Sequence, residues 1–530
     1  MRNFELPGRS PVHGVHGMAA TSQPLSTQTA IEVLKAGGNA LDAAIAACAV
    51  QCVVEPQSTG IGGDCFCLYA PQGNDRVIGF NGSGKAPTGA TTEWFAANGI
   101  TELERSSPHS VVVPGAIDAW WQLNRDHGSM PLAELLQPAI GYARDGYPIS
   151  SRVHRDINKQ KVFLQHDQVS FNRFLPGGEA PPVGALHKQP ELAATLQRIA
   201  AQGRDGFYQG EVAEDIVTHL NSLGGLHTLD DFARVQGDYV TPITTDYRGF
   251  TVHECPPNGQ GLIALLLLNM MQAHTADGDA LSPERMHLEI EACRQAYAAR
   301  TRYLADPAYA DVPIDALLED AYATRLRNAI DPDRATHPTP AIELPHHQDT
   351  VYISVVDKDR NTCSFINTLF WPFGSGISSP NTGVMLTNRA QGFVLDPNSP
   401  NCIAPGKRPL HTIIPGLLTR DGKAVMSFGV MGGEYQSMGH MQFLTRYLDY
   451  RMDIQEAQDA PRFMADPFDG SVEVEVGVPE STREVLRAKG HNIISAENPI
   501  GGSQAIAIDW EQGVLTGGSD PRKDGCAIGY

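Results

Sequence analysis

The stretch HHQDTVYISVVDKDRNTCSFINTLFWPFGSG, residues 346–376, sets our expectation for the fold. An apolar run that ends at Val356 is followed by the polar stretch 357–361 and then by a second apolar run. This pattern predicts strand, tight turn, strand. The first strand begins with Thr350, directly after a polar segment that contains two histidines.

The composition of the chain changes at this point. Residues from about 331 to 347 lack periodicity and are rich in Pro, His and Asp, which indicates a loop or linker that ends at Thr350. The part before the linker is mostly helical in pattern, and its region 26–54 predicts two helices broken at Gly37-Gly38. The part after the linker is rich in strands until DIQEAQDAPRFM at 453–464.

A threonine in this position can become a chain terminus. A threonine hydroxyl is a poor nucleophile unless a base accepts its proton. If Thr350 becomes N-terminal, its own α-amine, with a reference pKa of roughly 7.7 to 8.0, is that base. The chain must then cut itself, with the Thr350 hydroxyl attacking the carbonyl of Asp349. On the residues alone, an ordinary strand start is the simpler interpretation.

The bulk properties exclude several classes of protein. The 530 residues carry a formal net charge of −20, which argues against a nucleic acid or an anionic membrane as partner. The nine cysteines are odd in number and mostly in apolar settings, which suits a reducing compartment. Residues 1–14 contain no apolar stretch typical of a secretory signal, and the apolar run 261–271 is too short to span a bilayer, so it predicts a buried helix. We therefore expect a cytoplasmic protein.

Motifs on both sides of Thr350 resemble, in order, those of the γ-glutamyltranspeptidases, and they cover nearly the whole chain. The motifs that begin at or after Thr350 are TVYISVVDKDRN, FGSGI, GKRPL, VMGGE, AQDAPRF and GGSDPRKDGCA. The motifs before it are GMAATSQPLSTQTAIEVLKAGGNALDAAIA, VEPQSTGIGGD, VVPGAIDAW, ARDGYPIS, GFYQG and DYRGFTVHECPPNGQG.

The resemblance implies an N-terminal-nucleophile hydrolase of the α+β class, with two antiparallel sheets between helical layers in a four-layer αββα sandwich. It implies self-cleavage between Asp349 and Thr350 into a large subunit, 1–349, and a small subunit, 350–530, that together form one catalytic unit. Thr350 is then the nucleophile, and Thr368 holds its amine and hydroxyl. Gly432 and Gly433 supply N–H groups to an oxyanion hole, the alternative being a plain tight turn.

The sequence departs from the family where the substrate binds. Counting back from Ala86-Pro87 puts Ser83 in place of the arginine that grips the glutamyl α-carboxylate. The residues that replace the family's other substrate-binding side chains are Phe370, Arg389, Gly392, His411 and Thr412. We keep Asn81, Ser83 and Thr412 as candidate pocket residues. His411 either contacts the substrate or is a packed, hydrogen-bonded histidine.

These departures favour a small anionic substrate. Arg389 would repel an α-ammonium group, whereas it can grip a carboxylate in bidentate fashion, and Phe370 reduces the available room. Arg389 in an ordinary ion pair is the alternative. The same departures resemble a branch of the family that includes oxamate amidohydrolase of purine catabolism. We therefore predict hydrolysis of oxamate to oxalate and ammonia.

Three alternatives stay open. A γ-glutamyl hydrolase or transpeptidase, or an acylase for larger side-chain amides, belongs to the same class. A metal site would use Cys65 and Cys67 or His346 and His347, but their spacing matches no known metal motif. A processed but inactive scaffold is the third. We expect no cofactor, no metal, and no partner beyond the substrate and the other fragment, with a dimer of heterodimers left open.

Overall fold

The computed structural model describes residue 5, residues 8–336 and residues 350–530. Two seven-stranded sheets form its centre, and every pairing within them is antiparallel. The first sheet has the order β19 (Cys526–Gly529), β2 (Met18–Thr21), β10 (Val351–Val356), β11 (Thr362–Thr368), β3 (Asp64–Ala70), β4 (Ile78–Gly82) and β7 (Asp238–Val240). The second has the order β1 (Val12–Gly14), β18 (Val514–Ser519), β17 (Gly502–Asp509), β13 (Lys423–Met431), β12 (Gly416–Arg420), β9 (Phe250–Glu254) and β8 (Ile243–Tyr247).

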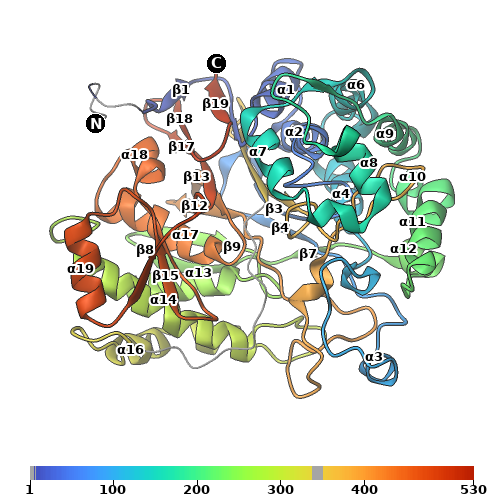
Figure 1. Ribbon diagram of the computed structural model, residues 1–530. Coiled ribbons are helices and arrows are strands. Elements are labelled where there is room, and N and C mark those ends of the chain that lie inside the picture. The colour runs from blue at the N-terminus through green and yellow to red at the C-terminus, as the bar shows by residue number, and fades with distance from the viewer. Residues whose placement is uncertain (1–4, 6–7, 337–349) are drawn as a thin grey trace.

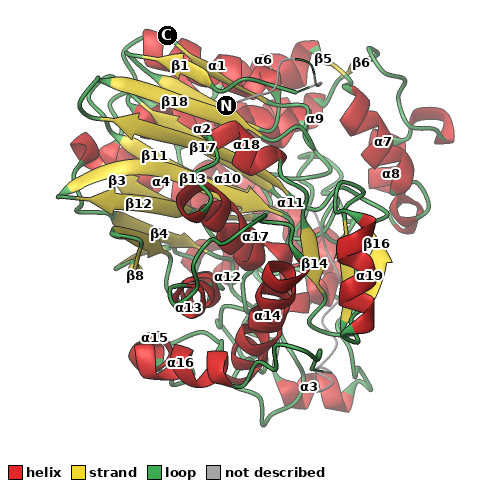
Figure 2. Cartoon of the chain, turned by 90° about the vertical axis from the view of Figure 1, so that its left-hand side faces the viewer, coloured by secondary structure: helices red, strands yellow, loops and turns green. Residues whose placement is uncertain are grey.

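Helices cover the outer face of each sheet, which gives the predicted four-layer sandwich (Figures 1 and 2). The main helices over the first sheet are α1 (Pro24–Lys35), α2 (Ala40–Val54), α4 (Ala116–His127), α6 (Gln137–Asp145), α9 (Pro190–Gln202) and α11 (Gly210–Ser222). Those over the second are α13 (Gly261–Met271), α14 (Pro283–Tyr303), α17 (Tyr435–Leu444) and α18 (Ile454–Asp459).

The remaining elements lie at the periphery. A small sheet contains β14 (Phe463–Ala465), β15 (Ser471–Val474) and β16 (Asn492–Ser495), with α19 (Glu480–Ala488) beside it, and β5 (Tyr147–Pro148) pairs with β6 (Leu186–His187). The other helices are α3 (Thr92–Ala97), α5 (Leu132–Leu135), α7 (Ser151–Lys159), α8 (Gln168–Phe174), α10 (Asp205–Tyr208), α12 (Leu229–Arg234), α15 (Ile314–Leu318) and α16 (Asp320–Asn328).

The strand, turn, strand predicted around Thr350 is present as β10 and β11, joined through residues 357–361. Every residue of both strands is buried, because helices cover one face of the first sheet and the second sheet covers the other. Side chains alternate between these faces. Ile353 and Val355 belong to the apolar core that contains the helices, whereas Tyr352 belongs to the core between the sheets. Thr350, two residues before Tyr352, therefore starts the row that faces the second sheet.

The predicted helices are also confirmed. Region 26–54 lies in α1 and α2, which are separated at Gly37-Gly38, and the apolar run 261–271 is the buried helix α13. No helix among the described residues has both the length and the apolar character needed to cross a bilayer.

Candidate active site

Two threonine hydroxyls meet where β10 begins and β11 ends. Thr350 and Thr368 are both fully buried, and their Oγ1 atoms lie 3.3 Å apart. The hydroxyl of Thr368 also accepts a hydrogen bond of 2.9 Å from the backbone N–H of Phe370. The β10–β11 ladder thus brings together the nucleophile and the second threonine that the resemblance implies. Asp349, the other side of the expected cut, lies outside the described residues.

The stacking of the sheets places Thr350 near the end of β13. The Ser354 hydroxyl bonds to the carbonyl of Ser427 at 3.3 Å, and Tyr352 packs so closely on Gly429 that a Cβ there would lie 2.3 Å from the Tyr352 ring. Residues earlier in β10 therefore lie against residues later in β13. Continued by two more residues at about 3.3 Å each, this register brings Thr350 to the end of β13, where Gly432 follows.

Gly432 and Gly433 link β13 to α17 in a conformation that suits an oxyanion hole. Their φ angles are +124° and +57°, and a Cβ on Gly432 would lie 2.9 Å from the Cα of Gly501. Among the described residues, neither N–H group donates a hydrogen bond to another group. The positive end of the α17 dipole lies just beyond them. Two free donors at this position can stabilise a developing negative charge.

Arg389 is fully buried beside this site. Its Nε donates to Asp64 Oδ2 at 3.2 Å and its Nη1 to Thr412 Oγ1 at 3.3 Å. The ring of Phe370, which has a φ of +82°, lies with its centroid 3.7 Å from the guanidinium carbon. The third nitrogen, Nη2, has no hydrogen-bond partner among the described residues. Arg389 is therefore oriented with one donor still available, rather than with the open two-nitrogen fork expected from the sequence.

Asp64 connects the arginine to the two threonines. It faces Thr368 across the β3–β11 ladder, and its Oδ1 accepts the N–H of Gly84 at 2.6 Å. Its Oδ2 lies 3.2 Å from His411 Nε2 as well as from Arg389. Burial alone would raise the pKa of Asp64, but His411, Arg389 and Gly84 together hold that pKa below its usual value.

Burial also shifts the two groups that face Asp64. It lowers the pKa of Arg389 to about 10 in spite of the neighbouring carboxylate. Burial, together with the positive charge of Arg389, lowers the pKa of His411 to about 4, so this ring is neutral at neutral pH. The cluster therefore contains one cation, one anion and a neutral histidine that packs on Phe66 with ring centroids 4.8 Å apart.

Asn81 and Ser83, the other candidate pocket residues, both bond to the buried Asn258. The Asn81 amide donates to Asn258 Oδ1 at 2.8 Å, and the Asn258 amide donates to Ser83 Oγ at 3.2 Å. The carbonyl of Asn258 in turn accepts the N–H of His411 at 2.8 Å. These side chains support the segment that holds His411 rather than standing free.

Gln260 joins the arginine cluster to the glycine pair. Its Nε2 donates to the carbonyls of Thr412 and Gly433 at 2.8 and 3.0 Å. Its Oε1 accepts from Arg300 at 3.0 Å. The sequence argument overlooked both Gln260 and Asp64, although they stand in the quoted motifs PPNGQG and VEPQSTGIGGD. The sequence feature that could have identified them is a polar residue at or near the end of a glycine-rich segment.

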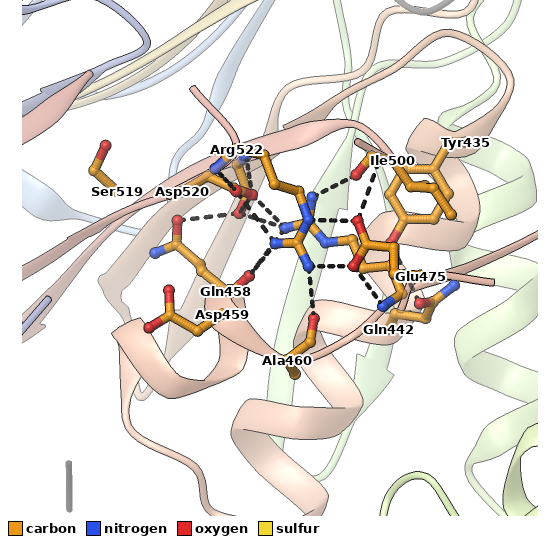
Figure 3. A network of polar contacts seen from close by, with 12 residues as sticks. Tyr435, Gln442, Gln458, Asp459, Ala460, Glu475, Ile500, Ser519, Asp520 and Arg522 are labelled. Carbon is orange, nitrogen blue, oxygen red and sulfur yellow. Dashed lines mark hydrogen bonds and ion pairs between the residues drawn. The ribbon is translucent and has the colours of Figure 1, made fainter. Parts of the chain in front are cut away.

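A buried charge network holds the loop that packs against Gly432 (Figure 3). Arg522 donates from Nε to Glu475 Oε1 at 2.6 Å and from Nη1 to Asp520 Oδ1 at 3.2 Å. Glu475 Oε1 also accepts the N–H of Ile500 at 3.2 Å. Since Gly501 approaches Gly432 closely, residues of the motifs AQDAPRF and GGSDPRKDGCA help to hold the glycine pair in place.

The two cysteines do not support the alternative of a metal site. Cys65 and Cys67 are buried in β3, and burial raises the pKa of both thiols. The nearest sulfur partner of Cys67 is Cys363, at 3.8 Å. His346 and His347 lie outside the described residues.

Known proteins resemble this chain over its full length. The family model for gamma-glutamyltranspeptidase matches residues 26–530. A glutathione hydrolase-like proenzyme, YwrD, from Bacillus subtilis is 36% identical over 98% of this chain and 99% of its own. The oxamate amidohydrolase proenzyme of Klebsiella pneumoniae is 33% identical over 97% of this chain and 98% of its own.

A solved structure agrees with the fold. The crystal structure of cephalosporin acylase from Bacillus halodurans superimposes with a TM-score of 0.93 at 38% identity, and it covers 100% of this chain and 99% of that one. The chain therefore belongs to the γ-glutamyltranspeptidase family of amide-bond hydrolases with an N-terminal nucleophile.

Proposed function

We propose that the chain cuts itself between Asp349 and Thr350 and then uses Thr350 as its nucleophile. In the precursor the Thr350 hydroxyl attacks the Asp349 carbonyl, and water hydrolyses the resulting ester to leave fragments 1–349 and 350–530. The facing hydroxyls of Thr350 and Thr368 support this role, since the second can orient the first. The relatives named as proenzymes agree with processing of this kind.

In turnover, the freed α-amine of Thr350 takes the proton of its own hydroxyl, and Oγ1 attacks the substrate carbonyl. The oxyanion that forms accepts hydrogen bonds from the N–H groups of Gly432 and Gly433, which contribute several kcal/mol if each is worth about 3 kcal/mol. Collapse expels the amine, which receives the proton held by the α-amine. Water then hydrolyses the acyl ester and regenerates the threonine.

We infer that the substrate is a small amide with a carboxylate next to the scissile carbonyl, most simply oxamate. The observation that carries this inference is the buried Arg389, whose Nη2 has no partner among the described residues. The carboxylate of Asp64 is already engaged by Gly84, Arg389 and His411, so it offers little to the ammonium of a glutamyl group. Phe370, stacked on Arg389, favours a compact ligand. Oxamate and water would yield oxalate and ammonia.

Two other substrate classes are the competing proposals. The relative at 36% identity is named glutathione hydrolase-like, which favours a γ-glutamyl amide. The structure at TM-score 0.93 is a cephalosporin acylase, which favours a larger acyl group. Both would use the same threonine. They differ from the oxamate proposal only in the substrate that binds beside Arg389 and Phe370.

A substrate panel with the processed protein tests the proposal. Ammonia release is measured with oxamate and glutamine, and anilide release with a γ-glutamyl anilide. We expect kcat/KM for oxamate to exceed the others by at least 100-fold. Equal or faster turnover of the γ-glutamyl compound would reject the role given to Arg389 while leaving Thr350 as nucleophile. The first residue of the small fragment, read by N-terminal sequencing, tests the cleavage site separately.

The setting of the enzyme is part of the same proposal. All nine cysteines are free, which suits a reducing cytoplasm. The two fragments stay together as a heterodimer, since β10 and β11 of the small fragment pair with β2 and β3 of the large one.

A further inference from the structure

A buried cluster of two histidines and a glutamate lies apart from the residues described above. His287 and Glu291 are one helical turn apart on α14, and His491 directly precedes β16. Their exposed fractions are 2%, 0% and 3%. One ligand atom from each side chain lies within 4.8 Å of the others. Two imidazoles and a carboxylate are a common ligand set for a divalent metal ion.

The hydrogen bonds of the cluster determine where the ring protons sit. His287 Nε2 lies 2.8 Å from the carbonyl of Asp331, which can only accept, so this nitrogen carries the proton. Nδ1 of His287 lies 2.7 Å from His491 Nε2. When Nδ1 accepts this hydrogen bond, His491 donates from Nε2.

This arrangement leaves a bare lone pair on His491 Nδ1. That atom has no hydrogen-bond partner among the described residues, and it faces Glu291 Oε1 at 4.0 Å. Two acceptors that face each other in a dry interior are unfavourable unless a cation lies between them.

The surroundings resemble the outer shell of a metal site. A metal-ligating histidine usually donates its other ring N–H to a carbonyl, as His287 does to Asp331. Glu291 is oriented by Arg294 Nη1 at 2.7 Å and by the N–H and hydroxyl of Thr336. These three donors leave about one of the four acceptor positions of a carboxylate unused.

We propose that His287, Glu291 and His491 bind one divalent metal ion of the zinc type. Two bonds of about 2.1 Å each span at most about 4.2 Å, so the 4.0 Å between His491 and Glu291 already admits an ion, with a small inward shift for tetrahedral angles. His287 joins as the third ligand through Nδ1 when its hydrogen bond to His491 opens.

Given the proposed cut, this ion ties the two fragments together. His287 and Glu291 belong to the large fragment and His491 to the small one. The end of the described large fragment is held at the same place, since Ala335 donates to the carbonyl of Lys489 at 2.8 Å and Arg294 donates to that of Thr336 at 2.7 Å. Only this consequence rests on the proposed function, because the ligands lie together whether or not the chain is cut.

Metal content tests the proposal. Processed protein and the uncut Thr350→Ala variant are stripped with a chelator, loaded with Zn²⁺, freed of excess and measured by elemental analysis. We expect one zinc ion per 530-residue protein in both forms. The affinity for zinc should fall at least tenfold in His491→Asn and in Glu291→Gln. The matched control is His440→Gln, because His440 is also buried and lies 2.6 Å from a carboxylate, Glu254, with no third ligand among the residues that the structure describes.

Cobalt gives a readout that needs no variant. Co²⁺ bound to the unmodified protein should show the intense visible bands of a tetrahedral site, and Zn²⁺ should abolish them. A saturating excess of Zn²⁺, about 100 times Kd, should raise the Tm by about 2 °C. The proposal is overturned if Co²⁺ keeps the spectrum of the aqueous ion, or if His491→Asn retains as much zinc as the unmodified protein.

Discussion

Replacement of Arg389 by glutamine tests whether this arginine selects the proposed anionic amide. The guanidinium has one nitrogen on Asp64, one on Thr412 and one, Nη2, without a partner among the described residues. If a substrate carboxylate binds Nη2, the substitution removes one hydrogen bond between charged groups, worth about 1.5–3 kcal/mol. That corresponds to a loss of about 10- to 150-fold in kcat/KM for oxamate.

The assay compares oxamate with oxamide, in which a neutral amide replaces the carboxylate. Oxamide cannot form the charged contact, so its kcat/KM should change by less than about threefold. Arg389→Lys is the companion variant: it keeps the charge but loses the planar fork, and it should recover only part of the activity on oxamate. A loss of the same size on both amides would refute the reasoning, because it would mean that Arg389 supports the site without recognising the carboxylate.

The variant is expected to fold, because Asp64 keeps two other partners. Gly84 still donates to Oδ1, and His411 still lies against Oδ2. Loss of the Arg389 charge removes a repulsion that now lowers the pKa of His411, so that ring can accept a proton and pair with Asp64. The variant should therefore have a higher Tm at pH 6 than at pH 8.

Three further results are expected. Thr350→Ala should remain one uncut chain on a denaturing gel while Thr350→Ser still splits, and cleavage of the alanine variant at the same bond would remove the basis for the nucleophile. Gly432→Ala should lower kcat by at least tenfold, because its φ is +124° and a Cβ has no room there. Gly422→Ala, also at positive φ but with the nearest atom 4.0 Å from a Cβ, should keep full activity. Because the folded pKa of His411 is about 4 and the unfolded value about 6.5, the unfolded chain binds the proton first, so stability should fall by about 3 kcal/mol as the pH drops through that window. His411→Gln should lose less Tm than the unmodified protein between pH 7 and pH 4.5, and an identical loss in both would contradict the assignment.

The parts of the fold that could be predicted from sequence depend on local patterns. The two apolar runs around 357–361 specify β10 and β11 because a short polar turn joins them and both faces are buried. The pairing of Thr350 with Thr368 was implied by the family resemblance, and the ladder agrees with it because a hairpin brings its two ends together. Local signals of this kind survive without knowledge of the tertiary structure.

Long-range partners could not be predicted in this way. Asp64 and Arg389 are 325 positions apart, and their contact depends on the β3–β11 register and on the course of the chain after β11. Without Asp64, the sequence suggested an arginine with both outer nitrogens open to the substrate. The sequence could not show whether His411 contacts the substrate or is packed, because only the fold places it on Phe66 and facing Asp64.

The Arg389–Asp64 pair has no formal net charge, yet its environment still favours an anionic substrate. Arg389 is fully buried, and the fall of its pKa to about 10 shows that one shared carboxylate does not replace the water it has lost. A ligand that brings a second negative charge to Nη2 relieves that deficit, whereas a neutral ligand leaves it and an ammonium increases it. We therefore expect a carboxylate to bind at Nη2 more favourably than a neutral group or an ammonium.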